Sequence, residues 1–177
     1  NDNLEIYKYE ISRQNIIDLS NVDGLVHLAH ERIQSSRKNF IDDNNIIATK
    51  NIIESAKKYN INKVVFLSSH LAHNKTLSQY GKSKLMCEKF FLENNFIVIQ
   101  AGFVFGGEVS GFLKLLITQF KKKIFPIIFP QSPIYPIHVT DLNNSLLFIL
   151  NKNNLLKKKY ILGDKNPVKL KDFFNKI

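Results

Sequence analysis

The stretch KVVFLSSHLAHNKTLSQYGKSKLMCEKF, residues 63–90, decides the fold. Its first part, residues 63–69, is a nearly continuous apolar run that ends in two serines. Such a run is typical of a parallel strand that is covered on both faces. After a short loop, residues 78–94 predict a helix. This order of strand, loop and helix is one unit of an α/β sheet.

The rest of the chain repeats this alternation of strands and helices. The patterns predict an α/β fold with a doubly wound parallel sheet in a single domain. Thr140 is the expected cap of one helix, and the proline-rich stretch 126–136 is too interrupted for a central strand. Ligands of such sheets bind beyond the carboxyl ends of the strands, so the segments after the strands form the candidate site. Strands are predicted at 3–11, 23–29, 96–106 and 159–164, and helices at 42–60, 111–123, 140–152 and 168–177.

Composition places the chain among soluble globular proteins. It has 177 residues, of which 44% are hydrophobic and 23% are charged. Its apolar runs are too short to span a bilayer and no export signal is visible, so a cytoplasmic location is predicted. The single cysteine, Cys87, excludes an internal disulfide and fits a reducing compartment.

The chain is basic, with 25 lysines and arginines against 15 acidic residues and a formal net charge of +10. A basic nucleic-acid-binding module is therefore one alternative. The lysines are spread along the chain, however, with local runs only at 121–123 and 157–159. This spread favours solvated ends of helices and strands over a nucleic-acid surface.

Tyr80 and Lys84 lie four residues apart and therefore on one face of the predicted helix. A free tyrosine has a pKa near 10, and a nearby ammonium group lowers it. Such a tyrosine could exchange a proton with an alcohol oxygen, which a hydroxyl of Ser69 or Ser68 could also hold. The spacing alone is weak, because an ordinary pair of surface residues can have it.

Four histidines lie in or after the predicted strands, but no carboxylate or cysteine has the matching spacing of a metal site. They are His27, His30, His70 and His73. No metal site is predicted. Cys87 lies within a predicted helix without an activating group, and we interpret it as a packing residue.

Eight segments, taken in their order along the chain, favour an acid/base role of Tyr80 and Lys84 over an ordinary surface pair. Together they resemble the short-chain dehydrogenase/reductase superfamily, in its NAD-dependent epimerase/dehydratase branch and related atypical members. YGKSKLMCEKF is the strongest single match. The segments are KYEIS (8–12), VDGLVHLAH (22–30), NNIIATKNIIESAKK (44–58), KVVFLSSH (63–70), YGKSKLMCEKF (80–90), FIVIQAGFVFGG (96–107), YPIHVTDLNNSLLFIL (135–150) and YILGDKNPVKLKDFF (160–174).

The resemblance implies a Ser-Tyr-Lys site. Tyr80 would be the acid/base, Lys84 would hold the nicotinamide ribose and lower the pKa of Tyr80, and Ser69, or Ser68, would orient the substrate. The cofactor would be NAD or NADP, and the substrate a small molecule with a hydroxyl or keto group, such as a nucleotide-sugar. His138 and Asp141 would be structural. The residues at the cofactor would be Tyr80 and Lys84, Glu10 and Ile11 beside the adenine, Leu28, Ala29 and His30 after a strand, Asn45 in a helix, Ser68, and Gly102 and Phe103 near the nicotinamide.

The family's G-x-x-G-x-x-G turn, which binds the pyrophosphate at a helix N-terminus, is not formed by the seven glycines. The matching segments begin at the family's third strand. The sequence therefore predicts a partial Rossmann-like domain over 1–177, truncated at its N-terminus, with a minimal portion of the substrate lobe from about residue 107. The strand 23–29 would present an open apolar edge, which a homodimer or a separate N-terminal fragment could cover. We expect the chain alone to bind the dinucleotide poorly.

Three features depart from the enzymes of the family. His70 stands where a serine or threonine is usual, Gln100 stands where an arginine is usual, and the step from Ser69 to Tyr80 is short. The short step resembles atypical members, many of which bind NADP without known turnover. The sequence therefore leaves two readings open beside the nucleic-acid module. One is an NAD(P)-dependent epimerase/dehydratase-like oxidoreductase or isomerase, and the other is a non-catalytic NAD(P)-binding or assembly protein.

Overall fold

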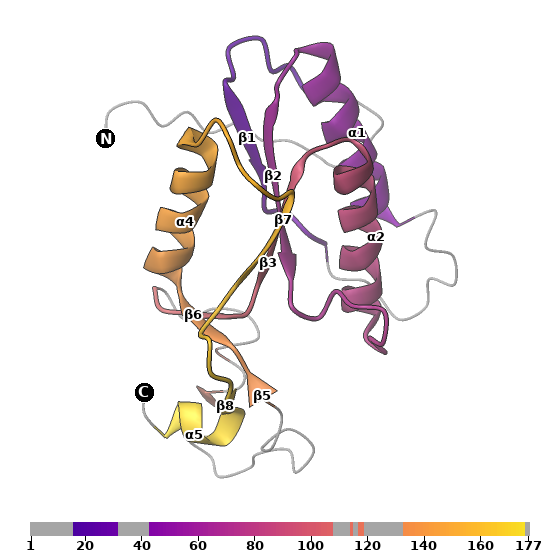
Figure 1. Cartoon of the computed structure of the whole chain (residues 1–177). Helices are drawn as coiled ribbons and strands as arrows, with labels where there is room; N and C mark the ends of the chain where they lie inside the picture. Colours follow the sequence, from indigo (N-terminus) through magenta and orange to yellow (C-terminus); the bar gives the residue numbers. More distant parts are fainter. Residues whose placement is uncertain (1–15, 32–42, 108–113, 115–116, 119–132, 176–177) are drawn as a thin grey trace.

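A parallel sheet of four strands forms the centre of the fold (Figure 1). The computed structural model describes residues 16–31, 43–107, 114, 117–118 and 133–175. The strands are β1 (Gly24–His27), β2 (Lys63–Ser69), β3 (Ile97–Ala101) and β7 (Lys159–Leu162), in the order β1-β2-β3-β7. Each neighbouring pair is parallel. The predicted α/β fold with a Rossmann-like parallel sheet is therefore confirmed.

Both faces of this sheet are covered by helices. Val64 and Phe66 of β2 pack with α1 (Asn44–Lys58) and α2 (Gln79–Glu93), whereas Val65 packs on the opposite face with α4 (Val139–Asn151). Figure 1 shows α4 on one side of the sheet and α1 and α2 on the other. All three side chains are fully buried. The continuous apolar run of β2 is explained by this packing, because successive strand residues face opposite sides.

Side-chain caps fix where the helices begin. Asp43 accepts a hydrogen bond from the backbone N–H of Asn45 at the start of α1, and Ser78 accepts one from Gly81 at the start of α2. The prediction that Thr140 caps α4 is wrong. The cap is His138, whose Nδ1 accepts from the backbone N–H of Thr140 at 3.3 Å, so Thr140 already lies inside the helix.

The strand predicted at 96–106 is two strands in two different sheets. β3 ends at Ala101, and β4 (Phe103–Phe105) pairs in parallel with β6 (Pro136–His138). Gly102 lies at the break, where a Cβ atom would be 1.9 Å from the carbonyl oxygen of Tyr135. The backbone can turn from one sheet to the other because glycine has no side chain at this close approach.

A small lobe lies beyond the carboxyl ends of the main strands (Figure 1). Besides β4 and β6 it contains β5 (Pro133–Ile134), which pairs antiparallel with β8 (Val168–Lys169), and α5 (Leu170–Phe174). Its core is formed by α5 with aromatic rings of β4. Pro133 and Pro136 lie in these short strands outside the main sheet, as the interrupted sequence predicts.

Some predicted elements lie outside the described residues. These are the strand at 3–11 and all but three residues of the helix at 111–123. Among the residues that are described, β1 is one edge of the main sheet and pairs with β2. The described helices include none with the length and apolar character needed to cross a bilayer.

Candidate active site

The candidate site lies where β1, β2 and β3 end. Because these strands are parallel, their carboxyl ends share one edge of the sheet. Three segments leave this edge: residues 28–31 after β1, residues 70–78 between β2 and α2, and the turn at Gly102. The sequence-predicted residues of these segments are Leu28, Ala29, His30, Ser69 and Gly102.

Ser69 and Tyr80 interact directly at this edge. Tyr80 is the second residue of α2 and keeps 40% of its surface exposed. Burial of the remainder raises the pKa of Tyr80 above its ordinary value of 10.0, and a side-chain hydrogen bond with Ser69 partly offsets that rise. The Ser69 hydroxyl also accepts from the backbone N–H of Leu71 at 3.2 Å. The structure therefore brings together the predicted hydroxyl and the predicted acid/base.

Lys84 follows one helical turn after Tyr80 and is 3% exposed. Its Nζ donates to the carbonyl oxygen of Leu67 at 2.8 Å and lies 4.6 Å from the centroid of the Phe66 ring. Desolvation lowers the pKa of Lys84 to about 8, although the nearby Cys87 and Glu88 act to raise it. At neutral pH the group is still mostly an ammonium.

The expectation that Lys84 lowers the pKa of Tyr80 stays a prediction, because in this arrangement Lys84 is not among the influences on that pKa. The Lys84 Nζ is 6.0 Å from the centroid of the Tyr80 ring, and its hydrogen bond goes to Leu67 instead. Desolvation is the largest influence on Tyr80 and raises its pKa. At neutral pH the Tyr80 hydroxyl is therefore protonated, which suits donation of a proton more than its removal.

His30 is packed against Tyr80, with ring centroids 5.0 Å apart in an edge-on arrangement. Its Nε2 atom is buried and has no hydrogen-bond partner among the described residues. Desolvation, followed by the charge of Lys84, lowers the pKa of His30 to about 4. The ring is therefore neutral at neutral pH. Leu28 and Ala29 before it are exposed at the sheet edge.

Asn45 fastens the segment after β1 to the start of α1. Its Oδ1 accepts from the backbone N–H of Glu31 at 2.7 Å, and its Nδ2 donates to the Glu31 carbonyl oxygen at 3.1 Å. The same Nδ2 donates to Asp43 at 2.8 Å, and Asp43 in turn accepts from the Ser83 hydroxyl of α2 at 2.9 Å. These polar groups of Asn45 are used within the protein, where they position the loop that carries His30.

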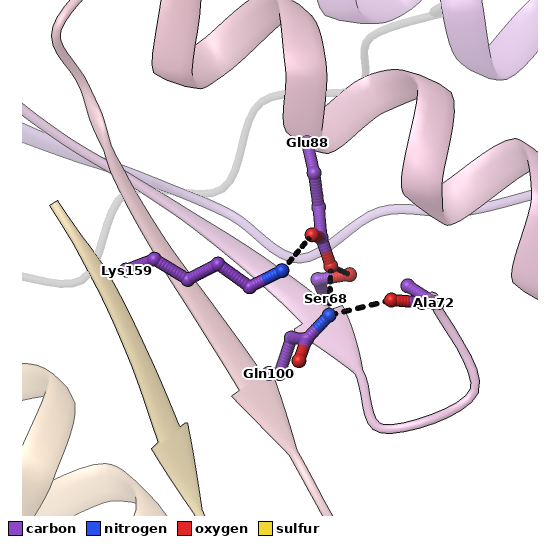
Figure 2. Close-up of polar contacts among 5 residues, drawn as sticks. All are labelled: Ser68, Ala72, Glu88, Gln100 and Lys159. Carbon is purple, nitrogen blue, oxygen red and sulfur yellow. Dashed lines mark hydrogen bonds and ion pairs between the residues drawn. The ribbon is translucent and has the colours of Figure 1, made fainter. Parts of the chain in front are cut away.

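Two of the remaining sequence-predicted residues, Ser68 and Phe103, are described by the structure. Ser68 is 4% exposed, and its hydroxyl donates to the buried carboxylate of Glu88 (Figure 2). Phe103 packs edge-on against Phe173 of the small lobe, with centroids 5.5 Å apart. Glu10 and Ile11, predicted beside an adenine, lie outside the described residues. Of the two serines, Ser69 is the one that meets Tyr80.

Gly81 is a site residue that the sequence did not single out. A Cβ atom at this position would lie 2.4 Å from the carbonyl oxygen of Leu71 and 2.5 Å from Oγ1 of Thr76. The loop before α2 therefore passes directly over the helix, and this contact holds Tyr80 near Ser69. The only sequence signal was the glycine itself, next to Tyr80.

The described residues contain no group of three histidines, cysteines or acidic residues that could hold a metal ion. His27 instead packs beside Phe66 and Phe91, with ring centroids 5.5 and 6.0 Å away, and these two phenyl rings stack on each other at 4.8 Å. Burial raises the pKa of Cys87 to about 11, so it is an unreactive thiol in the core.

A family model described as polysaccharide biosynthesis protein matches residues 8–126, which is more than half of the chain. No curated protein matches the sequence of this chain.

Many solved structures are similar to this chain. UDP-N-acetylglucosamine 4-epimerase from Bacillus cereus has a TM-score of 0.67 at 17% identity, over 97% of this chain and 68% of that one. MoeE5 in complex with UDP-glucose and NAD has a TM-score of 0.74 at 19% identity, over 94% and 65%. dTDP-glucose 4,6-dehydratase from Bacillus anthracis in complex with NAD has 0.73 at 20%, over 95% and 61%. The present chain thus spans 61% to 68% of the length of these three proteins, and at such identities the likeness shows a shared fold.

Proposed function

The chain belongs to the polysaccharide biosynthesis protein family, within the NAD-dependent epimerase/dehydratase group of short-chain dehydrogenase/reductases. From this membership we propose that it functions as an NAD(P)-dependent oxidoreductase that acts on a nucleotide-sugar. The observation that carries the proposal is the contact of Ser69 with Tyr80, with Lys84 one turn along the same helix. A hydroxyl, a phenol and a buried ammonium on one side of a sheet edge suit proton transfer at a sugar oxygen.

The structural relatives support the substrate class. The names of three of them specify UDP-N-acetylglucosamine, UDP-glucose or dTDP-glucose, and two of the three are complexes with NAD. All are nucleotide-sugar proteins on the same fold. We carry this class, and not any single sugar, to the present chain.

The residues at the sheet edge fit a dinucleotide with ribose hydroxyls. Lys84 has three N–H donors and uses one of them on Leu67, and the buried Nε2 of His30 has no partner among the described residues. We assign the nicotinamide ribose to Lys84 and a second polar contact to His30. NAD(P), when bound, supplies the hydride acceptor and donor for a sugar carbon.

The protein groups then handle the oxygen of the same carbon. Ser69 holds the oxygen by a hydrogen bond, and Tyr80 gives it a proton when the sugar is a ketone. For the reverse direction the pKa of Tyr80 has to fall. That change follows if the Lys84 ammonium moves from Leu67 toward the phenol, because a nearby positive charge favours the phenolate.

A non-catalytic dinucleotide-binding or assembly protein is the second candidate. The raised pKa of Tyr80 favours it, because the phenol as it stands is a poor base. Tyr80→Phe separates the two candidates, because it removes the hydroxyl group that would transfer the proton and leaves the ring against His30.

The experiment compares wild type with Tyr80→Phe on UDP-glucose, UDP-N-acetylglucosamine and dTDP-glucose with NAD+ or NADP+. Both proteins are tested as the chain alone and together with a polypeptide that supplies a strand–glycine-rich turn–helix unit of the family. We expect Tyr80→Phe to lower turnover about 10²–10⁴-fold and to leave dinucleotide affinity within about threefold. Turnover that is equal in both proteins would exclude the acid/base role. Dinucleotide binding without turnover in either protein would establish the second candidate.

A further inference from the structure

Glu88 is a buried carboxylate that the proposed proton transfer does not use. It lies on α2, one turn beyond Lys84, and is 1% exposed. A buried charge is strongly unfavourable unless it is paired and hydrogen-bonded. Figure 2 shows how Glu88 meets this requirement: Oε1 accepts from the Ser68 hydroxyl and from Nε2 of Gln100 at 2.8 Å, and Oε2 accepts from Nζ of Lys159 at 2.6 Å.

Lys159 supplies the positive charge from a distant part of the chain. It is the first residue of β7, 71 positions after Glu88, and its side chain is 36% exposed. The pair is charge-assisted and its acidic partner is fully desolvated, so loss of Lys159 would remove the positive charge that is hydrogen-bonded to the carboxylate. Lys84, the other nearby lysine, directs its hydrogen bond to Leu67.

The ion pair is linked to the loop between Ser69 and Tyr80. Gln100 donates with the same Nε2 to Glu88 and to the carbonyl oxygen of Ala72 at 2.7 Å. Ala72 is buried, and its backbone N–H donates to the Ser69 carbonyl oxygen at 2.9 Å. A continuous path of hydrogen bonds therefore runs from β7 through α2 and β3 into the loop.

We propose that Lys159 is a positioning residue, which fixes Glu88 and through Ser68 and Gln100 sets the loop that holds Ser69 against Tyr80. Its importance for turnover rests on the proposed function, whereas its effect on the loop does not. The loop also passes closely over Gly81, so a shift of Ala72 would change how α2 presents Tyr80.

The test measures hydrogen exchange by mass spectrometry in peptides that cover 70–78. Lys159→Met removes the charge and keeps most of the side-chain length. We expect exchange in this loop to become about tenfold faster, while peptides from α4 stay within about twofold of wild type. Lys159→Arg should retain wild-type protection, because a guanidinium can also reach Glu88. Lys158→Met, at the exposed neighbouring position, is the matched control and should change nothing.

Two further variants separate a positioning role from general stability. Gln100→Met removes the hydrogen bonds to Ala72 and Glu88 and leaves the Lys159–Glu88 ion pair, so exchange in the loop should also become faster. Glu88→Gln combined with Lys159→Met keeps an acceptor for Ser68 and Gln100 without a buried charge, so the loop should be protected again. This double variant also decides the question if Lys159→Met alone does not fold.

The proposal is overturned by any of three results. One is unchanged loop exchange in Lys159→Met or in Gln100→Met, and another is an increase spread evenly over the whole molecule. A double variant that stays as unprotected as Lys159→Met would likewise overturn it. Absence of turnover on every nucleotide-sugar leaves these exchange results standing, so failure of the proposed function is distinguishable.

Discussion

The ring of His30 lies edge-on to the ring of Tyr80, with the two centroids 5.0 Å apart. His30 comes from the segment after β1 and Tyr80 from the first turn of α2, so this contact joins two of the three segments at the sheet edge. The pKa of His30 is lowered to about 4, and the neutral ring can therefore pack against the phenol beside the Lys84 ammonium. Protonation of buried histidines should loosen this side of the fold.

The first prediction concerns the pH dependence of stability. The pKa of His27 is also lowered to about 4, mainly by desolvation, from an ordinary value of 6.5. A histidine with a depressed folded-state pKa contributes its full stability above 6.5 and loses it as the pH falls toward 4. We expect up to about 3 kcal/mol of pH-dependent loss from His27.

This loss can be measured by urea denaturation between pH 7.5 and 4, with the slope of unfolding free energy against pH as the readout. His27→Phe removes the titrating group and keeps an aromatic ring beside Phe66 and Phe91, so the slope should become shallower. His73→Asn, at an exposed histidine, is the control and should keep the wild-type slope. An equal slope in wild type and His27→Phe would contradict the prediction.

The second prediction concerns Gly81. Alanine normally favours a helix over glycine by about 1 kcal/mol. At this position its Cβ would overlap the Leu71 carbonyl oxygen and Thr76, so we expect Gly81→Ala to destabilise the protein by about 1–3 kcal/mol. Thermal denaturation measures this change. Lys82→Ala, at the exposed neighbour, should remain within about 0.5 kcal/mol of wild type. A stabilised Gly81→Ala would show that the loop does not pass so closely.

The third prediction concerns Asn45, which ties Glu31 to α1. Asn45→Ala removes both side-chain contacts with the Glu31 backbone, and we expect a loss of about 2 kcal/mol. The amide of Glu31 should then exchange faster with solvent, as measured by NMR. Asn44→Ala is the matched control, because Asn44 bonds to the exposed Glu31 side chain at 2.6 Å and should contribute below about 1 kcal/mol. Equal effects of the two substitutions would remove the special role of Asn45.

The fourth prediction concerns Lys84, whose replacement should affect stability and turnover differently. Its pKa is lowered to about 8 by burial, so at pH 7 the fold holds a charge that would be more favourable in water. Lys84→Met should therefore leave the free energy of unfolding unchanged or raise it by about 1–2 kcal/mol at pH 7. Under the proposed function it should abolish dinucleotide-dependent turnover. Lys82→Met serves as the exposed control, and strong destabilisation by Lys84→Met alone would indicate a purely structural lysine.

Much of the fold could be predicted from the sequence, because local patterns determine it. The apolar run of β2 ends at Ser69 as expected, and α1 and α2 begin at polar caps that the sequence displays. The break between β3 and β4 was missed, since residues 96–106 are apolar apart from Gln100 and the turn depends on Tyr135, a distant neighbour of Gly102. A pattern within one segment carries no information on such a contact.

The site was predictable in its residues and less so in their partners. The resemblance pointed to Ser69, Tyr80 and Lys84, and the structure places them together, whereas their roles in catalysis and in cofactor binding stay predictions. Gln100, a departure from the family pattern, is explained by the structure. It bridges Glu88 and Ala72, while the positive charge comes from Lys159, which no local spacing relates to Glu88.

The separation of Glu88 from its counter-ion also has a consequence for the order of folding. As the chain is synthesised, α2, β2 and β3 are complete well before Lys159 appears on the last strand of the sheet, 71 residues after Glu88. Until β7 pairs with β3, packing of α2 against the sheet would bury the Glu88 carboxylate without the Lys159 ammonium, and this disfavours packing at that stage. We expect the ion pair to form after the main folding barrier, so that Lys159→Met accelerates unfolding more than it slows refolding in stopped-flow measurements. Pairing of β7 would then be a late step of folding that slows the unfolding of the sheet.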